Sequence, residues 1–123
     1  MATRAITSAD FEKTVTDNDI VLVDFWATWC GPCKAFGPVF EAASEANPDI
    51  VFAKVDIDQN QDLAAAAGIS AVPTLMIAKK GQIIFKQAGA LRAADLDDLI
   101  AQARKLDLSA ANAGAGANGA AAQ

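Results

Sequence analysis

The sequence predicts an α/β fold with a central mixed β-sheet that has helices on both faces. The first observation is that apolar, β-branched segments at 20–27, 50–57 and 74–78 alternate with segments of helical spacing, which is typical of βαβ units. The second is that the turn sequence KKGQ at 79–82 leads to the apolar run IIFKQ at 83–87, which indicates a closing hairpin. The hairpin adds antiparallel pairing, so we expect the sheet to be mixed.

The N-terminal segment is expected to contain a helix and the first buried strand. The sequence TSADFEKTVTDN at 7–18 predicts a short helix with Thr7 or Ser8 as N-cap and acidic residues in its first turn. A short strand near Ala5 is also compatible with the pattern. The almost continuous apolar run at 20–27 predicts a strand that is buried on both faces.

The helix after this strand is indicated by its apolar spacing and its prolines. Between Cys33 and Asn47 the apolar side chains recur at helical intervals, and Pro48 marks the end of the helix. Pro38 lies inside the pattern, so we expect the helix to kink there. The apolar positions are Phe36, Val39, Phe40 and Ala43.

Two further helices are predicted in the C-terminal half of the chain. The sequence DLAAAAG at 62–68 predicts a short helix that Gly68 stops. The last helix is expected from about Ala93 to Leu106, because the apolar residues there share one face. These residues are Leu96, Leu99, Ile100, Ala103 and Leu106.

Length and composition fit one domain followed by a short tail. A chain of 123 residues suits a single core, and we assign residues 1–108 to one domain. Residues 109–123 contain only Ala, Gly, Asn, Ser and Gln, without a charge or a large apolar side chain. Such a segment buries too little surface to offset its ordering entropy, so we predict that it is disordered.

Charge and hydropathy argue against several classes of function. The net charge is −5, so the chain lacks the basic patch that would neutralise nucleic-acid phosphates. The N-terminus has no apolar signal core, and no apolar run reaches the length of a membrane span. We therefore expect a soluble, cytoplasmic monomer without membrane contacts. The lack of histidine in the sequence removes histidine acid–base catalysis and histidine metal ligands.

The two cysteines of the chain, Cys30 and Cys33, lie in the sequence WCGPC at 29–33. A zinc site needs four ligands, and two thiols without histidine would need a second chain or two carboxylates to complete it. A structural disulfide that closes so short a loop removes little chain entropy. In a reducing compartment an isolated pair is more often catalytic or metal-binding than structural, so we interpret it as a redox dithiol that needs no metal and no bound cofactor.

The position of the pair favours a reactive thiolate. Cys30 is expected at the N-terminus of the helix, where free amides and the macrodipole stabilise a thiolate, and Cys33 lies one turn further on the same face. Pro32 fits the first turn because its missing N–H would have no intrahelical partner there. We expect Cys30 to be the exposed nucleophile and Cys33 the deeper, resolving thiol. Trp29, Gly31 and Pro32 would form a flat substrate-binding surface around the sulfur, although Trp29 could also be a packing aromatic.

These motifs resemble those of the thioredoxin family. The stretch VLVDFWATWCGPCKAFGP at 21–38 matches the active-site segment of the family, KVDIDQN at 54–60 its next strand, VPTL at 72–75 its cis-proline loop and AGA at 88–90 its late glycine turn. The resemblance covers about residues 5–107 and implies the thioredoxin fold and protein-disulfide reductase activity. It also implies regeneration by an NADPH-dependent thioredoxin reductase, with disulfide-containing proteins as substrates.

Two charged residues in the predicted strands are candidates for proton transfer. Asp24 interrupts an apolar run, and burial of an isolated carboxylate should raise its pKa, unless the residue lies at a strand end and reaches water. The resemblance implies that Asp24 lies behind Cys33 and assists its deprotonation. Lys54 could be an ordinary strand-edge charge, but the resemblance implies that it is a partner of Asp24 that adjusts the pKa of this carboxyl group.

The backbone around Pro73 is the remaining part of the candidate site. Pro73 could simply begin a strand, and Gly89 could be an ordinary turn glycine. The resemblance implies that the Val72–Pro73 bond is cis and lies against the cysteines, so that the Val72 backbone binds an extended substrate and Gly89 completes the groove. It also implies that Trp26, otherwise a core residue, shields the site and bonds Asp58 through its indole N–H.

Two other functions are possible on this fold. An oxidant or isomerase typically has a histidine between its cysteines, whereas Gly31 and Pro32 occupy that space here. A non-catalytic scaffold would not need an intact cysteine pair. Ala71 and Ala88 depart from the glycine and the larger aliphatic residue that are common in the family, which bears on the choice of partner.

Overall fold

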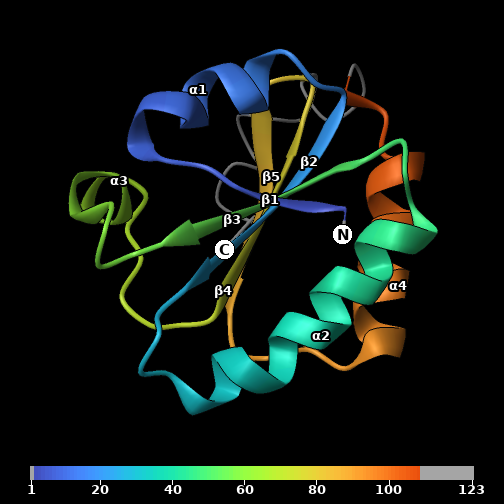
Figure 1. The fold of residues 1–123 in the computed structure, drawn as a ribbon. Coiled ribbons are helices and arrows are strands. Elements are labelled where there is room, and N and C mark those ends of the chain that lie inside the picture. The colour runs from blue at the N-terminus through green and yellow to red at the C-terminus, as the bar shows by residue number, and fades with distance from the viewer. Residues whose placement is uncertain (1, 109–123) are drawn as a thin grey trace.

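The computed structural model describes residues 2–108, which form a five-stranded mixed sheet with helices on both faces (Figure 1). The predicted fold class is confirmed, and the short strand near Ala5 is present. The prediction of a disordered tail concerns residues 109–123 and lies outside the described residues. The elements in chain order are β1 (Thr3–Ala5), α1 (Ser8–Thr16), β2 (Ile20–Trp26), α2 (Gly31–Ala46), β3 (Val51–Asp56), α3 (Gln61–Ala66), β4 (Thr74–Lys79), β5 (Gln82–Ala88) and α4 (Ala93–Lys105).

Strand β2 lies at the centre of the sheet, whose strand order is β1-β3-β2-β4-β5. Strand β3 pairs in parallel with β1 and β2, whereas β4 pairs antiparallel with β2 and with β5. Because β2 has a strand on each side and helices on each face, its residues are buried from Ile20 to Phe25. Asp24 therefore lies in the middle of a buried strand, away from water at either strand end.

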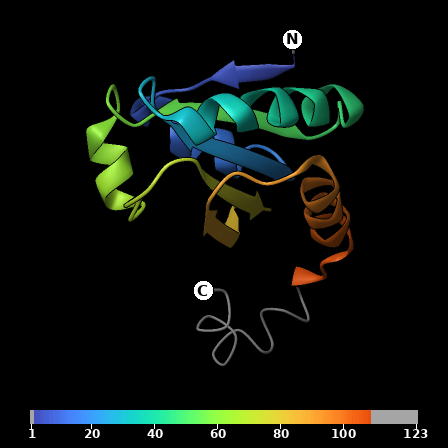
Figure 2. The ribbon, with the colours of Figure 1, turned by 90° about the horizontal axis from the view of Figure 1, so that it is seen from below.

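Alternate residues of β2 point to opposite layers of helices. Ile20 and Leu22 belong to the core beneath α2 and α4, and Val21 and Val23 belong to the core beneath α1 and α3. Figure 2 shows α3 and α4 on opposite sides of the sheet. Asp24 has the same parity as Leu22, so it points toward the layer that contains α2, the helix of the cysteine pair.

Local signals set the helix boundaries. Thr7 is the N-cap of α1, and its backbone N–H donates to the Asp10 carboxylate. Helix α2 includes Pro38 and ends before Asn47, close to the predicted limits. Gly68 follows α3 with a positive φ of 70°, which glycine adopts without strain, and it stops the helix as predicted. Strand β4 continues one residue beyond the expected end, so Lys79 belongs to the sheet rather than to the turn.

Candidate active site

The two cysteines form a disulfide at the start of α2. Cys30 is the N-cap of the helix, and its Sγ atom accepts the backbone N–H of Cys33 at 3.1 Å. Pro32 lies in the first helical turn, as the sequence predicts. A sulfur in this position faces the free amides at the positive end of the helix dipole, so a thiolate is stabilised there once the disulfide is opened.

The expected difference in exposure between the two cysteines is wrong for this disulfide form. Cys30 is 4% exposed and Cys33 is 6% exposed. Both belong to a small apolar cluster with Ala27, against which Val72 packs. Joining the sulfurs brings both into the same buried environment, so their positions on the helix, and not their exposure, distinguish them.

Trp29 forms the exposed surface beside the disulfide. It is 66% exposed, which excludes its interpretation as a packing aromatic, and Gly31 and Pro32 next to it are also exposed. Its indole Nε1–H donates to Asp58 Oδ2 at 2.8 Å. The expected bond from Trp26 to Asp58 is therefore wrong. Asp58 follows β3 in an exposed turn within reach of the exposed indole, whereas the Trp26 side chain is partly buried at the end of β2.

The loop that carries Pro73 lies against the cysteines. The Val72–Pro73 peptide bond is cis, and Cys30 Sγ lies 3.5 Å from the Val72 carbonyl oxygen. The Gly89 N–H donates to the Pro73 carbonyl at 2.8 Å, and the positive φ of Gly89, 110°, explains the choice of glycine there. Among the described residues, no hydrogen bond takes up the Val72 N–H. Val72 therefore presents a free donor next to the disulfide.

Asp24 is a buried carboxylate without a hydrogen bond. It is 1% exposed, and neither carboxylate oxygen has a partner among residues 2–108. Burial raises the pKa of Asp24 to about 6, and the positive charge of Lys54 partly offsets this rise. Lys54 is the register partner of Asp24 on β3, and its Nζ atom lies 5.2 Å from the centroid of the Trp26 ring. The alternative that Asp24 reaches water at a strand end is excluded.

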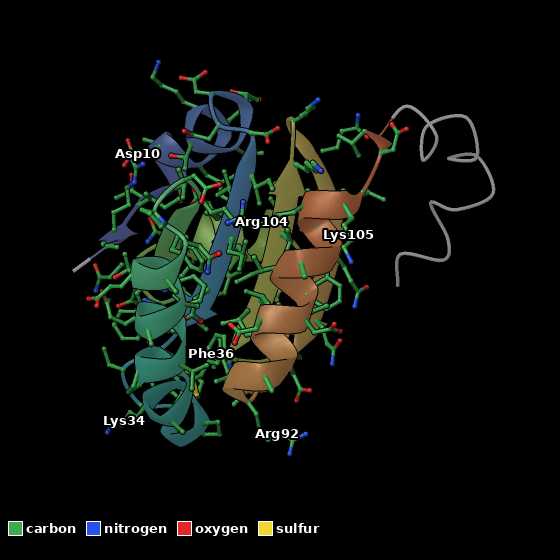
Figure 3. All side chains as sticks on the ribbon, turned by 90° about the vertical axis from the view of Figure 1, so that its right-hand side faces the viewer. Asp10, Lys34, Phe36, Arg92, Arg104 and Lys105 are labelled. Atoms are coloured by element: carbon green, nitrogen blue, oxygen red, sulfur yellow. A yellow bond between two sulfur atoms is a disulfide. The ribbon has the colours of Figure 1, made fainter. Side chains whose placement is uncertain are left out.

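A surface hollow of about 350 Å³ connects the cysteine helix with Lys54. Cys33 and Lys54 both line it, and Lys54 is the residue opposite Asp24 in the sheet. Figure 3 shows the sulfur atoms at the end of α2 that carries Lys34, another residue of the hollow. The lining residues are Trp26, Ala27, Thr28, Cys33, Lys34, Gly37 and Lys54.

One contact of the loop was not anticipated from the sequence. The hydroxyl of Thr74 donates to the Ala71 carbonyl at 2.6 Å, although Thr74 is the first residue of a buried strand. A polar residue directly after Pro73, at a position where an apolar residue would pack, is the signal that could have revealed it.

The described part of the chain has neither a cluster of metal ligands nor a helix that could span a membrane. Within residues 2–108, no group of three or more His, Cys, Asp or Glu side chains could hold a metal ion. No helix in the same part of the chain is both long enough and apolar enough to cross a membrane.

A cysteine pair that begins a helix after the central strand of a mixed α/β sheet defines a dithiol–disulfide oxidoreductase. Comparison with known proteins agrees with this class. The family model described as Thioredoxin matches residues 2–102. A relative from Streptomyces coelicolor is 58% identical over 107 residues, which are 87% of this chain and 80% of the relative.

Two other similar proteins are named thioredoxin. The thioredoxin of Haemophilus influenzae is 43% identical over 99 residues, which are 79% of this chain and 92% of that protein. The X-ray structure of Fasciola hepatica thioredoxin superposes with a TM-score of 0.76 at 38% identity, covering 81% of this chain and 98% of that one. The chain therefore belongs to the thioredoxin family of protein-disulfide oxidoreductases, and its Cys30–Cys33 pair is the pair for thiol–disulfide exchange.

Proposed function

We propose that this protein reduces disulfide bonds in other proteins, with Cys30 as the attacking thiol and Cys33 as the resolving thiol. The observation that carries the proposal is the disulfide at the N-terminus of α2, with Cys30 as the N-cap. In the reduced form, the Cys30 thiolate attacks one sulfur of the substrate disulfide, that bond breaks and one substrate thiolate leaves. The Cys33 thiolate then attacks Cys30 Sγ, the second substrate thiolate leaves, and two electrons have passed to the substrate.

In this proposal Asp24 accepts the proton of Cys33. A carboxylate with a pKa of about 6 is mostly ionised at neutral pH and still basic enough to take up a proton. Its oxygens have no partner in residues 2–108, and the hollow beside Cys33 and Lys54 is large enough to hold water. The proton would therefore pass through water. Lys54 lowers the pKa of Asp24 and so keeps the carboxylate in its basic form.

The substrate would bind on both sides of the disulfide. On one side, Trp29, Gly31 and Pro32 offer an exposed, low-polarity surface. On the other side, an extended substrate segment would pair with the free N–H of Val72, while Pro73 and Gly89 shape the groove.

Membership of the family supports a proposal for the partners of this reaction. A thioredoxin reductase that uses NADPH would return the disulfide to the dithiol, so the protein itself needs no bound cofactor. Its substrates would be disulfide-containing proteins, and nucleic acid is not expected as a partner because the net charge is −5. We propose a cytoplasmic location, because a reducing compartment keeps such a pair available as a dithiol, and we propose that the protein acts as a monomer.

Two single variants test the order of the cysteines. With dithiothreitol as reductant and insulin as substrate, Cys30→Ser should abolish insulin reduction, because the attacking thiol is lost. Cys33→Ser, reduced and freed of dithiothreitol before insulin is added, should instead accumulate a mixed disulfide with insulin that mass spectrometry detects, because no resolving thiol is left. Insulin reduction that survives Cys30→Ser, or a trapped complex with that variant, would reverse the two roles, whereas a wild-type protein that does not reduce insulin would indicate a scaffold function.

The redox equilibrium separates a reductase from an oxidant or isomerase. The fraction of the Cys30–Cys33 disulfide is measured in a graded glutathione buffer, where about 30 mV corresponds to a tenfold change in the equilibrium constant. We expect the disulfide to open only in strongly reducing buffer. If it opens in mildly oxidising buffer, the protein is an oxidant or isomerase and not a reductase.

A further inference from the structure

We infer that Thr74 is a positioning residue, which holds the Val72 backbone in the orientation that an extended substrate needs. The inference rests on the proposed function, in which the substrate pairs with Val72. The hydroxyl of Thr74 donates to the carbonyl of Ala71 at 2.6 Å, and Ala71 directly precedes Val72. Thr74 itself is 4% exposed and does not lie on the substrate-binding surface.

In the described part of the chain, no backbone N–H bonds the carbonyl of Ala71. Pro73 has no N–H, and the N–H of Val72 must stay free if it is to bind a substrate. A backbone bond that closed the turn would run from the Thr74 N–H to the Ala71 carbonyl, and no such bond is present within residues 2–108. The side-chain hydroxyl of Thr74 supplies the missing donor and fixes the carbonyl on the N-terminal side of Val72.

The other side of the same peptide segment is held by the residue that follows β5. The N–H of Gly89 donates to the Pro73 carbonyl at 2.8 Å. Val72 therefore lies between two hydrogen-bonded carbonyls, those of Ala71 and Pro73.

Thr74 connects this loop to a rigid part of the fold. It pairs in register with Phe25 on β2 and with Ala88 on β5, so its backbone is fixed on two sides. A β-branched side chain has few χ1 rotamers, which keeps the hydroxyl directed at one acceptor. Without this hydroxyl, we expect the loop to sample orientations in which Val72 no longer meets the substrate, while the cysteines remain unchanged.

The test compares a protein substrate with a small one in variants that differ by the hydroxyl alone. Thr74→Val keeps the shape of the side chain and removes the hydroxyl. The reduced protein is assayed with insulin, which uses the backbone of Val72, and with the small aromatic disulfide dithionitrobenzoate, which does not. Thermal unfolding of each variant accompanies the kinetics.

We expect Thr74→Val to raise the KM for insulin about three- to tenfold, the range that loss of one buried hydrogen bond produces, with kcat nearly unchanged. The rate with dithionitrobenzoate should stay within about twofold of the wild type, because a shift of the loop does not alter the thiolate. Thr74→Ser keeps the hydroxyl and should restore the wild-type KM. If Thr74→Val does not fold, Thr74→Ala and Thr74→Ser form a second pair, since both lack the methyl group and only serine can donate.

Several results would overturn the inference. An unchanged KM for insulin in Thr74→Val, an equal loss with both substrates, or equal KM values for the serine and alanine variants would each leave Thr74 with a structural role only. Failure of the proposed function looks different, because the wild-type protein itself would then not reduce insulin.

Discussion

Asp24 and Lys79 are both buried charged residues on neighbouring strands of the central sheet, yet their surroundings are opposite. Asp24 is 1% exposed and Lys79 is 7% exposed. They lie toward opposite ends of the β2–β4 pair, because Asp24 pairs with Leu75 and Lys79 pairs with Ile20. The carboxylate of Asp24 has no hydrogen-bond partner in the described part of the chain, whereas the ammonium of Lys79 has three.

The three partners of Lys79 explain why this charge stabilises the fold. They are the carbonyl oxygens of Ala103, Arg104 and Leu106, at 2.7, 3.1 and 2.8 Å from Nζ. Carbonyls at a helix C-terminus have no intrahelical donor, and the negative end of the helix dipole lies there. One ammonium group has three donors, so Lys79 satisfies three carbonyls at the end of α4 and joins that helix to β4.

The contrast supports the proposed role of Asp24 in proton transfer and gives Lys79 a structural role. The charge far from the cysteines is fully hydrogen-bonded and serves stability. The charge on the face that α2 covers lacks partners, so its pKa rises to about 6 and it can change its protonation state near neutral pH. Three substitutions test this difference, and they are described from the largest expected effect to the smallest.

Lys79→Met should destabilise the protein most. The methionine can fill much of the same space, but the carbonyls of Ala103, Arg104 and Leu106 at the end of α4 lose the Lys79 ammonium, which should lower the free energy of unfolding by about 3–4 kcal/mol. Urea unfolding at neutral pH measures the loss, and Lys80→Met, at the exposed neighbouring lysine, is the matched control. A loss below about 1 kcal/mol would mean that water replaces the ammonium without difficulty, and Lys79 would then not be structural.

Asp24→Asn should stabilise the oxidised protein in mildly alkaline solution. The folded-state pKa is raised from 3.8 to about 6, so the carboxyl group contributes stability below pH 3.8 that is lost as the pH rises through about 6. At 1.36 kcal/mol per pKa unit, the ionised form costs about 3 kcal/mol, and the neutral amide avoids this cost.

The pH dependence of this difference distinguishes an effect of ionisation from an effect of packing. The free energies of unfolding of wild type and Asp24→Asn should agree near pH 3, because the carboxyl group is then mostly neutral in the folded and the unfolded state, and should diverge to the full difference near pH 8. A difference that does not depend on pH would show that packing, and not ionisation, separates the two proteins.

Lys54→Met should have the smallest effect and should act mainly through the pKa of Asp24. Removing the positive charge removes the interaction that lowers this pKa, so it should rise further above about 6. The midpoint of the pH-dependent loss of stability should move upward by less than about one pH unit. Lys34→Met is the control, because Lys34 lines the same hollow but is not among the causes of the Asp24 shift. A downward move would mean that Lys54 does not act on Asp24 by its charge.

The sequence by itself determined the parts of the protein that depend on neighbouring residues. The apolar run of β2, the helical spacing of α2 and the stop at Gly68 are signals within a few residues, and each corresponds to an observed element. The position of Cys30 at a helix N-terminus follows from the same local pattern. The single acid in an apolar strand already indicated that Asp24 would be buried with a raised pKa.

Only the tertiary structure decided which groups meet across the fold. Lys79 reaches carbonyls 24 to 27 residues away, and Trp29 reaches Asp58, 29 residues away. No local pattern encodes such pairs, because they depend on how α4 packs against β4 and how the turn after β3 folds back to the cysteines. The near-equal burial of Cys30 and Cys33 likewise follows from the disulfide and its apolar cluster. Periodicity specifies each element, but the packing of elements against one another specifies the partners of a buried charge.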